Sequence, residues 1–154
     1  ASYYLCEMNG ADIIDIETEL QEWLKPYLHG ASAEGRREFG RAVSRYLYRS
    51  QSNRIRDQLN PDGTPFEARK KGRKAMFEKI RKRPNLTSRY SESEVWVAFR
   101  GRVGRIAKIH QEGLLSSPGP GQKKVRYEKR ELLGYTKQDV EKIKDLAEST
   151  LLPR

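Results

Sequence analysis

The stretch NPDGTPF, residues 60–66, constrains the fold more than any other feature of the chain. A residue that precedes proline is disfavoured in the helical conformation, so Asn60 is pushed toward extended backbone. The next three residues, Pro61-Asp62-Gly63, have the chemistry of a tight turn. Any helix that reaches this stretch is therefore expected to end there.

The residues after this turn predict a new helix. Thr64 can cap it, Pro65 suits the first helical position, and Glu67 lies three residues after the cap. The segment it would begin, residues 67–83, carries nine basic residues against two acidic ones and few apolar ones. We expect a mobile arm before Gly72, a short packed helix after it, and a basic elbow, residues 60–74, that projects from the body.

Two helices are predicted before the turn. Residues 12–27 place apolar side chains three and four apart, and Pro26 with the following HGAS is expected to end this helix. Residues 1–31 form an acidic region. A second helix is expected over residues 33–59, with Ser32 as its N-cap and arginines along its polar faces. Both a solvated face and a contact surface fit these arginines, and the absence of lysine favours contact.

The pattern then changes to strands. Residues 86–90 and 94–100 alternate and predict a hairpin joined by SES, and residues 124–129 are a third strand candidate. GRVGR breaks the pattern, residues 106–114 fit a short helix or an irregular crossing, and residues 115–123 form a loop by composition. Thr136, with Asp139 three residues later, predicts the start of a final helix. These elements predict a single α+β domain over residues 1–154, with a small, mostly antiparallel sheet.

The composition indicates the cellular compartment of the protein but does not distinguish between classes of binding partner. The net charge is +10, which suits nucleic acid, an acidic protein partner or solubility alike. No apolar run is long enough to cross a membrane, and the lone Cys6 fits a reducing compartment, so we expect a protein kept in a cytoplasm. Cys6 is expected to be an ordinary small apolar residue.

The chain shows no arrangement of catalytic residues. His29, His110 and Cys6 are not at metal-ligand spacing, and GRVGR lacks the lysine of a phosphate-binding loop. We therefore predict no enzyme, no metal and no cofactor. For His110 a structural or interface role is favoured over acid–base chemistry. Nonspecific binding to nucleic acid is the main alternative function, because aromatic residues lie between the basic ones.

Three stretches, in this order, resemble the phage virion morphogenesis family, which includes tail completion proteins of temperate contractile-tailed phages. They are RSQSNRIRDQLNPDGTPFEARK (residues 49–70), GRVGRIAKIHQEGL (101–114) and YEKRELLGYTKQDVEKI (127–143). The resemblance covers most of the chain from about residue 32 onward. It implies a structural virion protein of the tail or neck, assembled in the host cytoplasm, which forms a homo-oligomeric ring, most often a hexamer.

The resemblance also suggests partners and contact residues. The expected partners are further copies of the chain, the tail tube or sheath proteins and the head–tail connector proteins; a head-side neck adaptor and nonspecific DNA contact in the neck channel are the alternatives. The candidate assembly contacts are Asn60, Pro61, Asp62, Gly63, Thr64, Phe66, Arg69, His110, Gln111, Gly113, Arg130, Leu132 and Leu133. The candidate basic contact surface consists of Arg41, Arg45, Arg49, Lys70, Lys71, Arg73 and Lys74.

Overall fold

A computed structural model describes residues 11–153, with side chains from residue 19 onward. Cys6 and the acidic side chains of residues 12, 15 and 17 therefore lie outside the described part. The elements in chain order are α1 (Ala11–Gly30), α2 (Ala33–Arg56), β1 (Leu86–Tyr90), β2 (Val95–Phe99), α3 (Gly101–Glu112), β3 (Leu115–Ser116), β4 (Val125–Arg126) and α4 (Lys137–Leu151). The expected α+β class is confirmed.

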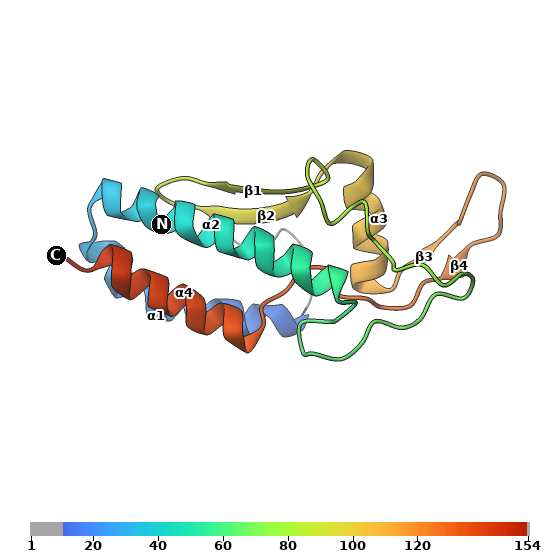
Figure 1. Cartoon of the computed structure of the whole chain (residues 1–154), viewed down its shortest axis with the longest axis horizontal. Coiled ribbons are helices and arrows are strands. Elements are labelled where there is room, and N and C mark those ends of the chain that lie inside the picture. The colour runs from blue at the N-terminus through green and yellow to red at the C-terminus, as the bar shows by residue number, and fades with distance from the viewer. Residues whose placement is uncertain (1–10, 154) are drawn as a thin grey trace.

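Helix α2 is the central element of an elongated molecule. The β1–β2 hairpin packs on one side of it and α4 on the other, with α1 packed against α4 (Figure 1). The core cluster accordingly joins Leu47 of α2 to Val97 of β2 and Ile143 of α4, all three fully or almost fully buried. Burial of this apolar stripe supplies most of the driving force that holds the layers together.

The start of α2 agrees with the sequence. Ser32 has extended backbone and its Oγ accepts a hydrogen bond from the Gly35 N–H at 3.0 Å, as an N-cap does. The helix ends at Arg56, three residues earlier than expected. Gln58 then takes a positive φ of 59°, and this turns the chain before the NPDGTPF stretch begins.

Helix α1 continues through Pro26, so the predicted end at Tyr27 is wrong. A proline inside a helix removes one hydrogen bond and costs about 3 kcal/mol. Here the exposed Pro26 lies between Leu24 and Leu28, which are both buried in the core. Apolar packing on both sides of the proline offsets its cost, and the helix reaches Gly30.

The predicted hairpin is confirmed. β1 and β2 pair in antiparallel register, with Ser88 opposite Val97, and the Ser91 side chain accepts hydrogen bonds from the Ser93 and Glu94 N–H groups in the turn. Gly40 lets α2 approach this turn, because a Cβ there would lie 3.0 Å from the Ser91 carbonyl oxygen. Side chains alternate along β2, and Val95 and Val97 lie on the face that packs into the core.

No helix follows the NPDGTPF stretch, so the helix start predicted at Thr64 and the short packed helix predicted after Gly72 are wrong. Thr64 does not act as a cap; its N–H donates to Asp62 Oδ1 at 2.9 Å, and Leu59 pairs with Pro65 in a short antiparallel bridge. Residues 67–75 are all exposed and run without regular structure. Most side chains of this segment are basic and none is a large apolar one, so the segment lacks the packed face that stabilises most helices.

The second half of the chain differs from the prediction in two places. GRVGR ends the strand pattern as predicted, but it forms the start of α3, so this helix begins five residues earlier than the short helix expected from residue 106. The helix ends at Glu112, and its C-cap Gly113 takes the left-handed conformation with φ 64°. Gly113 supplies that conformation at little steric cost. The expected loop at residues 115–123 is part of a longer ribbon in which only β3 and β4 pair, so the third strand is much shorter than predicted.

Helix α4 begins as predicted, with a complete capping box between Thr136 and Asp139. Asp139 is almost fully buried and also joins α4 to α2. Its Oδ1 accepts hydrogen bonds from the hydroxyls of Tyr46, at 2.9 Å, and Ser50. Burial, and then the nearby Asp139 carboxylate, raise the pKa of Tyr46 to about 12.

Asp139→Ala is expected to destabilise the protein more than Thr136→Ala. Loss of a cap costs about 1 kcal/mol, whereas Asp139→Ala also leaves two part-buried hydroxyls without their charged acceptor, which brings the expected loss to about 3 kcal/mol. Urea unfolding of the two variants measures both values. Equal losses would show that the bonds to Tyr46 and Ser50 add nothing to stability.

Candidate functional site

An extended segment, residues 130–134, is held by side chains from two helices; we call it the clamped segment. Gln51 of α2 donates from Nε2 to the Gly134 carbonyl at 3.0 Å and accepts at Oε1 from the Gly134 N–H at 3.1 Å. Gln111 of α3 makes the same pair of bonds with Leu133, at 2.8 and 3.0 Å. A carboxamide has the donor and acceptor of a peptide group, so each glutamine replaces a neighbouring strand.

Arg54 adds a buried cation to this arrangement. Its guanidinium donates to the backbone carbonyls of Glu131 at 2.9 Å and Leu132 at 2.8 Å, and also to Leu59 and to the Gln51 Oε1. None of these acceptors is a carboxylate, and burial lowers the pKa of Arg54 to about 10. Four neutral oxygens thus solvate the charge and join the end of α2 to the clamped segment.

The NPDGTPF turn packs directly against the clamped segment. Asn60 Oδ1 accepts a hydrogen bond from the Glu131 N–H at 2.9 Å. Gly134 lies against the Pro61 ring, where a Cβ would come within 2.5 Å of Pro61 Cγ. Because real Cβ atoms do not approach so closely, only glycine fits opposite this proline.

Arg130 and His110 fix the base of the exposed basic segment. Arg130 donates to the carbonyls of Glu67 at 2.7 Å and Ala68 at 3.1 Å, and its NH1 lies 3.3 Å from His110 Nδ1. The His110 ring also makes edge contacts with the rings of Phe77 and Tyr127. Burial, with the Arg130 charge as a second cause, lowers the pKa of His110 to about 4, so the ring is neutral near pH 7.

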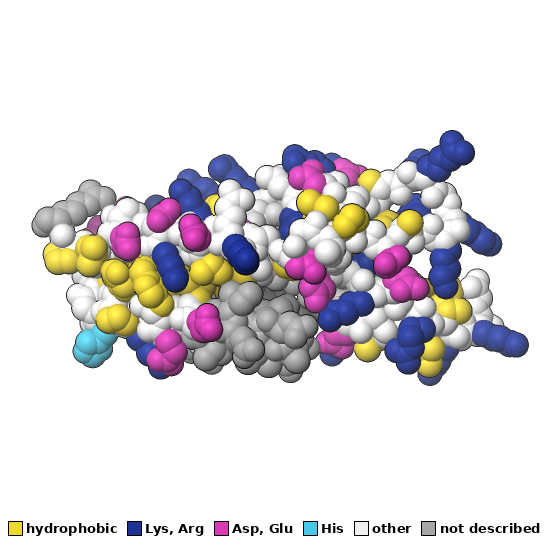
Figure 2. Space-filling view, turned by 90° about the horizontal axis from the view of Figure 1, so that it is seen from below, with side chains coloured by type: hydrophobic (Ala, Val, Ile, Leu, Met, Phe, Trp, Pro, Cys, Tyr) yellow, Lys and Arg dark blue, Asp and Glu magenta, His cyan; other side chains and the backbone are white. Residues whose placement is uncertain are grey.

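Two segments project beyond this junction at the end of the molecule opposite the C-terminus (Figure 1). We call residues 67–75 the basic arm and residues 114–129 the ribbon. The projecting end is strongly basic, and Figure 2 shows Lys and Arg side chains gathered there. The exposed basic residues of the two segments are Arg69, Lys70, Lys71, Arg73, Lys74, Lys123, Lys124, Arg126 and Lys129. Leu115 and Val125 of the ribbon are exposed as well, at 53% and 41%.

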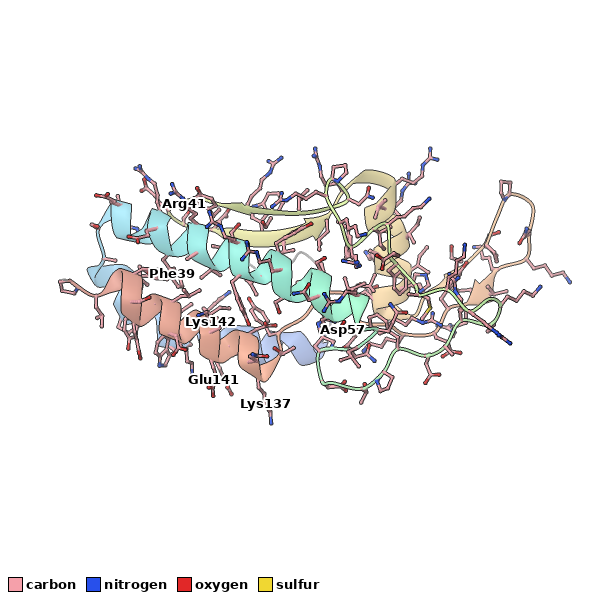
Figure 3. The ribbon with its side chains drawn as sticks, in the orientation of Figure 1. Phe39, Arg41, Asp57, Lys137, Glu141 and Lys142 are labelled. Atoms are coloured by element: carbon pink, nitrogen blue, oxygen red, sulfur yellow. The ribbon has the colours of Figure 1, made fainter. Side chains whose placement is uncertain are left out.

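A second basic feature is a groove of about 710 Å³ between α2 and β1. We call it the arginine groove. Its lining contains no acidic residue and consists of Arg41, Ser44, Arg45, Tyr48, Arg49, Arg83, Ser88, Arg89 and Tyr90. In Figure 3, Arg41 points up from α2, whereas Lys137, Glu141 and Lys142 lie on α4, on the lower side of the molecule.

The structure divides the candidate assembly contacts into internal and external residues. Asp62, Gly63, Thr64 and Arg69 are exposed, and Asn60, Pro61 and His110 are half-buried. The remaining six are buried within the protomer, where their contacts hold the fold, and a role in assembly stays a prediction: Phe66, Gln111, Gly113, Arg130, Leu132 and Leu133. The three sequence stretches that contain these residues thus meet at one junction, largely through internal contacts.

The candidate basic contact residues are all exposed but lie in two places. Arg41, Arg45 and Arg49 line the arginine groove, and Lys70, Lys71, Arg73 and Lys74 belong to the basic arm.

The clamp residues Gln51 and Arg54 were missed in the sequence. A signal exists for Gln51, since it lies four residues after Leu47 and four before Ile55, on the buried stripe of α2. Arg83, Arg89 and the groove tyrosines carry no local signal.

The described residues contain no cluster of three or more His, Cys, Asp or Glu side chains that could hold a metal ion. Within the same part of the chain, no helix has the length and apolar character to cross a membrane.

Comparison with known proteins gives one consistent result. A sequence model of the phage virion morphogenesis family matches residues 15–152. Tail completion protein S of Escherichia phage P2 is 32% identical over 136 residues, which cover 82% of this chain and 91% of that protein. No solved structure matches the chain significantly.

Replacement of Gln51 tests the clamp. Gln51→Leu keeps the size of the side chain but leaves both backbone polar groups of Gly134 and one Arg54 bond without partners, so we expect a loss of about 3 kcal/mol or more in the free energy of unfolding. Gln138→Leu, at an exposed position of α4, is the matched control and should change stability by less than about 0.5 kcal/mol. Equal effects in urea unfolding would contradict the clamp.

His110 makes stability depend on pH. Its pKa is about 4 in the fold and 6.5 ordinarily, so between these values the unfolded chain binds more protons. Stability should therefore fall as the pH drops from 6.5 toward 4, by at most about 1.4 kcal/mol per pH unit from this group. Unfolding of His110→Asn across this range should show a shallower dependence than the parent. His29→Gln, at an exposed site, should leave the dependence unchanged, and a parent-like slope for His110→Asn would refute the assignment.

Proposed function

Because the chain belongs to the phage virion morphogenesis family, we propose that it is a structural virion protein that completes the phage tail and acts by protein–protein assembly. The observation that carries this proposal is the match to a protein named as a tail completion protein over nine-tenths of that protein's length. The role requires no catalytic step. Its location is the tail or neck of the virion, with assembly in the host cytoplasm.

We further propose that copies of the chain form a closed ring, with six copies as the expected number, at the junction of tail and head. A ring needs a heterologous contact, in which one surface meets a different surface of the next copy. Two unlike faces support this. The face of α1 and α4 shows acidic side chains among apolar ones (Figure 2), and α4 carries the exposed Glu141, Asp145 and Glu148. The projecting end, by contrast, is strongly basic.

The projecting end is the proposed contact with tail tube, tail sheath or connector proteins. Asp62, Gly63 and Thr64 of the NPDGTPF turn are exposed beside it, and Arg69 begins its basic arm. The arm and the ribbon bury little within the protomer, yet Arg130 anchors their base at Glu67 and Ala68. A fixed base with an exposed tip is the arrangement expected of a segment that docks onto another protein.

Charge reversal on the basic arm tests this contact. Arg69→Glu with Lys71→Glu should leave the unfolding midpoint unchanged, because both side chains are exposed, and should lower by at least tenfold the yield of infectious particles when purified protein is added to lysates that lack it. Arg102→Glu with Arg105→Glu, on exposed positions of α3, makes the same charge change and should retain activity.

The mass of the parent protein in solution and its binding to isolated tails test the ring and its location. A complex of several copies that binds tails made without heads supports the proposal. A monomer that remains monomeric on tails would refute the ring. Binding to heads but not to tails would instead identify a head-side neck adaptor.

A further inference from the structure

The arginine groove contains a row of like charges in regular spacing. Arg41, Arg45 and Arg49 follow one another every fourth residue on α2, so they lie on one face of the helix and about 6 Å apart along it. Arg83 and Arg89 line the same groove from the chain before β1 and from β1 itself. Five arginines therefore line one open surface of a single protomer.

Two of these arginines, Arg41 and Arg83, are positioned by neutral groups. Arg41 Nε donates to the Tyr90 hydroxyl at 3.1 Å, and the Arg83 guanidinium lies 4.4 Å from the centre of the Tyr48 ring. The Tyr48 hydroxyl in turn accepts the Arg83 backbone N–H at 3.1 Å. A phenol orients a guanidinium without cancelling its charge, so the groove keeps its positive potential.

Some arginines outside the groove are paired with carboxylates. Arg37 pairs with Glu92, Arg56 with Asp57 and Arg81 with Glu78. Among the described residues no ion pair involves any of the five groove arginines. Carboxylates thus neutralise these three arginines, whereas none pairs with the five arginines of the groove.

We propose that the arginine groove binds the sugar–phosphate backbone of double-stranded nucleic acid, independently of sequence. Along the duplex axis one strand has a phosphate about every 3.4 Å, so a row about 12 Å long matches the axial extent of about three to four phosphates. Arginine presents a planar fork that bonds two phosphate oxygens at once. This site is separate from the assembly contacts proposed for the arm, and it does not depend on ring formation.

Two features favour this ligand over the alternatives. The core of a protein interface normally contains apolar anchors, whereas the groove is lined by arginine, serine and tyrosine alone. Single-stranded nucleic acid would stack its bases on free aromatic rings. Here Arg83 covers Tyr48, and the Arg41 guanidinium lies 6.0 Å from the Tyr90 ring centre, so the rings already serve as supports for the arginines.

The test uses the full chain and a 20-base-pair DNA duplex of random sequence. Fluorescence anisotropy gives the affinity between 50 and 200 mM salt for the parent, for Arg45→Gln with Arg49→Gln, and for Lys137→Gln with Lys142→Gln. The side chains of Arg45 and Arg49 make no hydrogen bond or ion pair within the described residues, and the control pair removes the same charge from the α4 face (Figure 3). Both double variants should therefore fold.

For the groove pair we expect at least tenfold weaker binding at 50 mM salt, and a slope of log affinity against log salt that is smaller in size by about 2. The control pair should change the affinity less than threefold. Equal losses in the two variants would overturn the proposal, since net charge alone would then explain binding. Tighter binding of poly-glutamate than of the duplex would overturn the proposal in favour of an acidic protein partner. Tighter binding of single-stranded DNA would overturn the assignment of double-stranded nucleic acid as the ligand.

This experiment and the test of the tail role fail separately. The anisotropy measurement needs no tails and no ring, and the mass of each variant shows whether its oligomeric state has changed. If a variant lost no activity in tail completion and the parent did not bind DNA through the groove, only the proposal that the groove binds DNA would be refuted. Loss of tail completion with intact DNA binding would remove only the assembly role.

Discussion

Two glutamine side chains and one buried arginine hold the clamped segment in place, and the arrangement of the whole projecting end depends on them. Buried backbone polar groups need partners, and an extended segment usually finds them in a neighbouring strand. Residues 131–134 have no such neighbour and bond instead to Gln51, Arg54, Asn60 and Gln111. These residues come from α2, from α3 and from the turn between them, so one network fixes the relative positions of three parts of the chain and the start of α4.

This network explains how a small protein can carry long exposed segments. An arm without an apolar face cannot hold its own direction, because its conformational entropy is not offset by burial. The protein anchors the basic arm and the ribbon at their bases instead. Phe66, just before the basic arm, is buried, and Arg130, just after the ribbon, bonds to Glu67 and Ala68 at the start of the arm. Rigidity is thus concentrated at the junction, and the tips remain exposed.

The sequence predicted the elements that follow one local rule and missed those that depend on distant contacts. Periodic apolar residues and caps identified α2 and α4, and alternation identified the hairpin. The residues Thr64, Pro65 and Glu67 match the start of a helix, but the Thr64 hydroxyl bonds to Asp62 instead of capping one. No apolar face follows, so a helix here would have had nothing to pack against the core. Pro26 failed as a stop for the opposite reason, since packing outweighed the local cost. The groove could not be foreseen, because Arg49 and Arg89 are forty positions apart in the chain.

The arginines of α2 show why composition alone could not assign a function to this basic helix. Near its start, Arg36 and Arg37 face Glu92 and tie the helix to the hairpin turn. Near its end, Arg54 is buried and binds backbone carbonyls, which makes it a structural cation. Between them, Arg41, Arg45 and Arg49 line an open groove that contains no carboxylate. One residue type on one helix thus serves three physical roles, set by what the rest of the fold brings opposite each turn. Only the middle turns keep their charge available, so an anionic partner of α2 has to bind there.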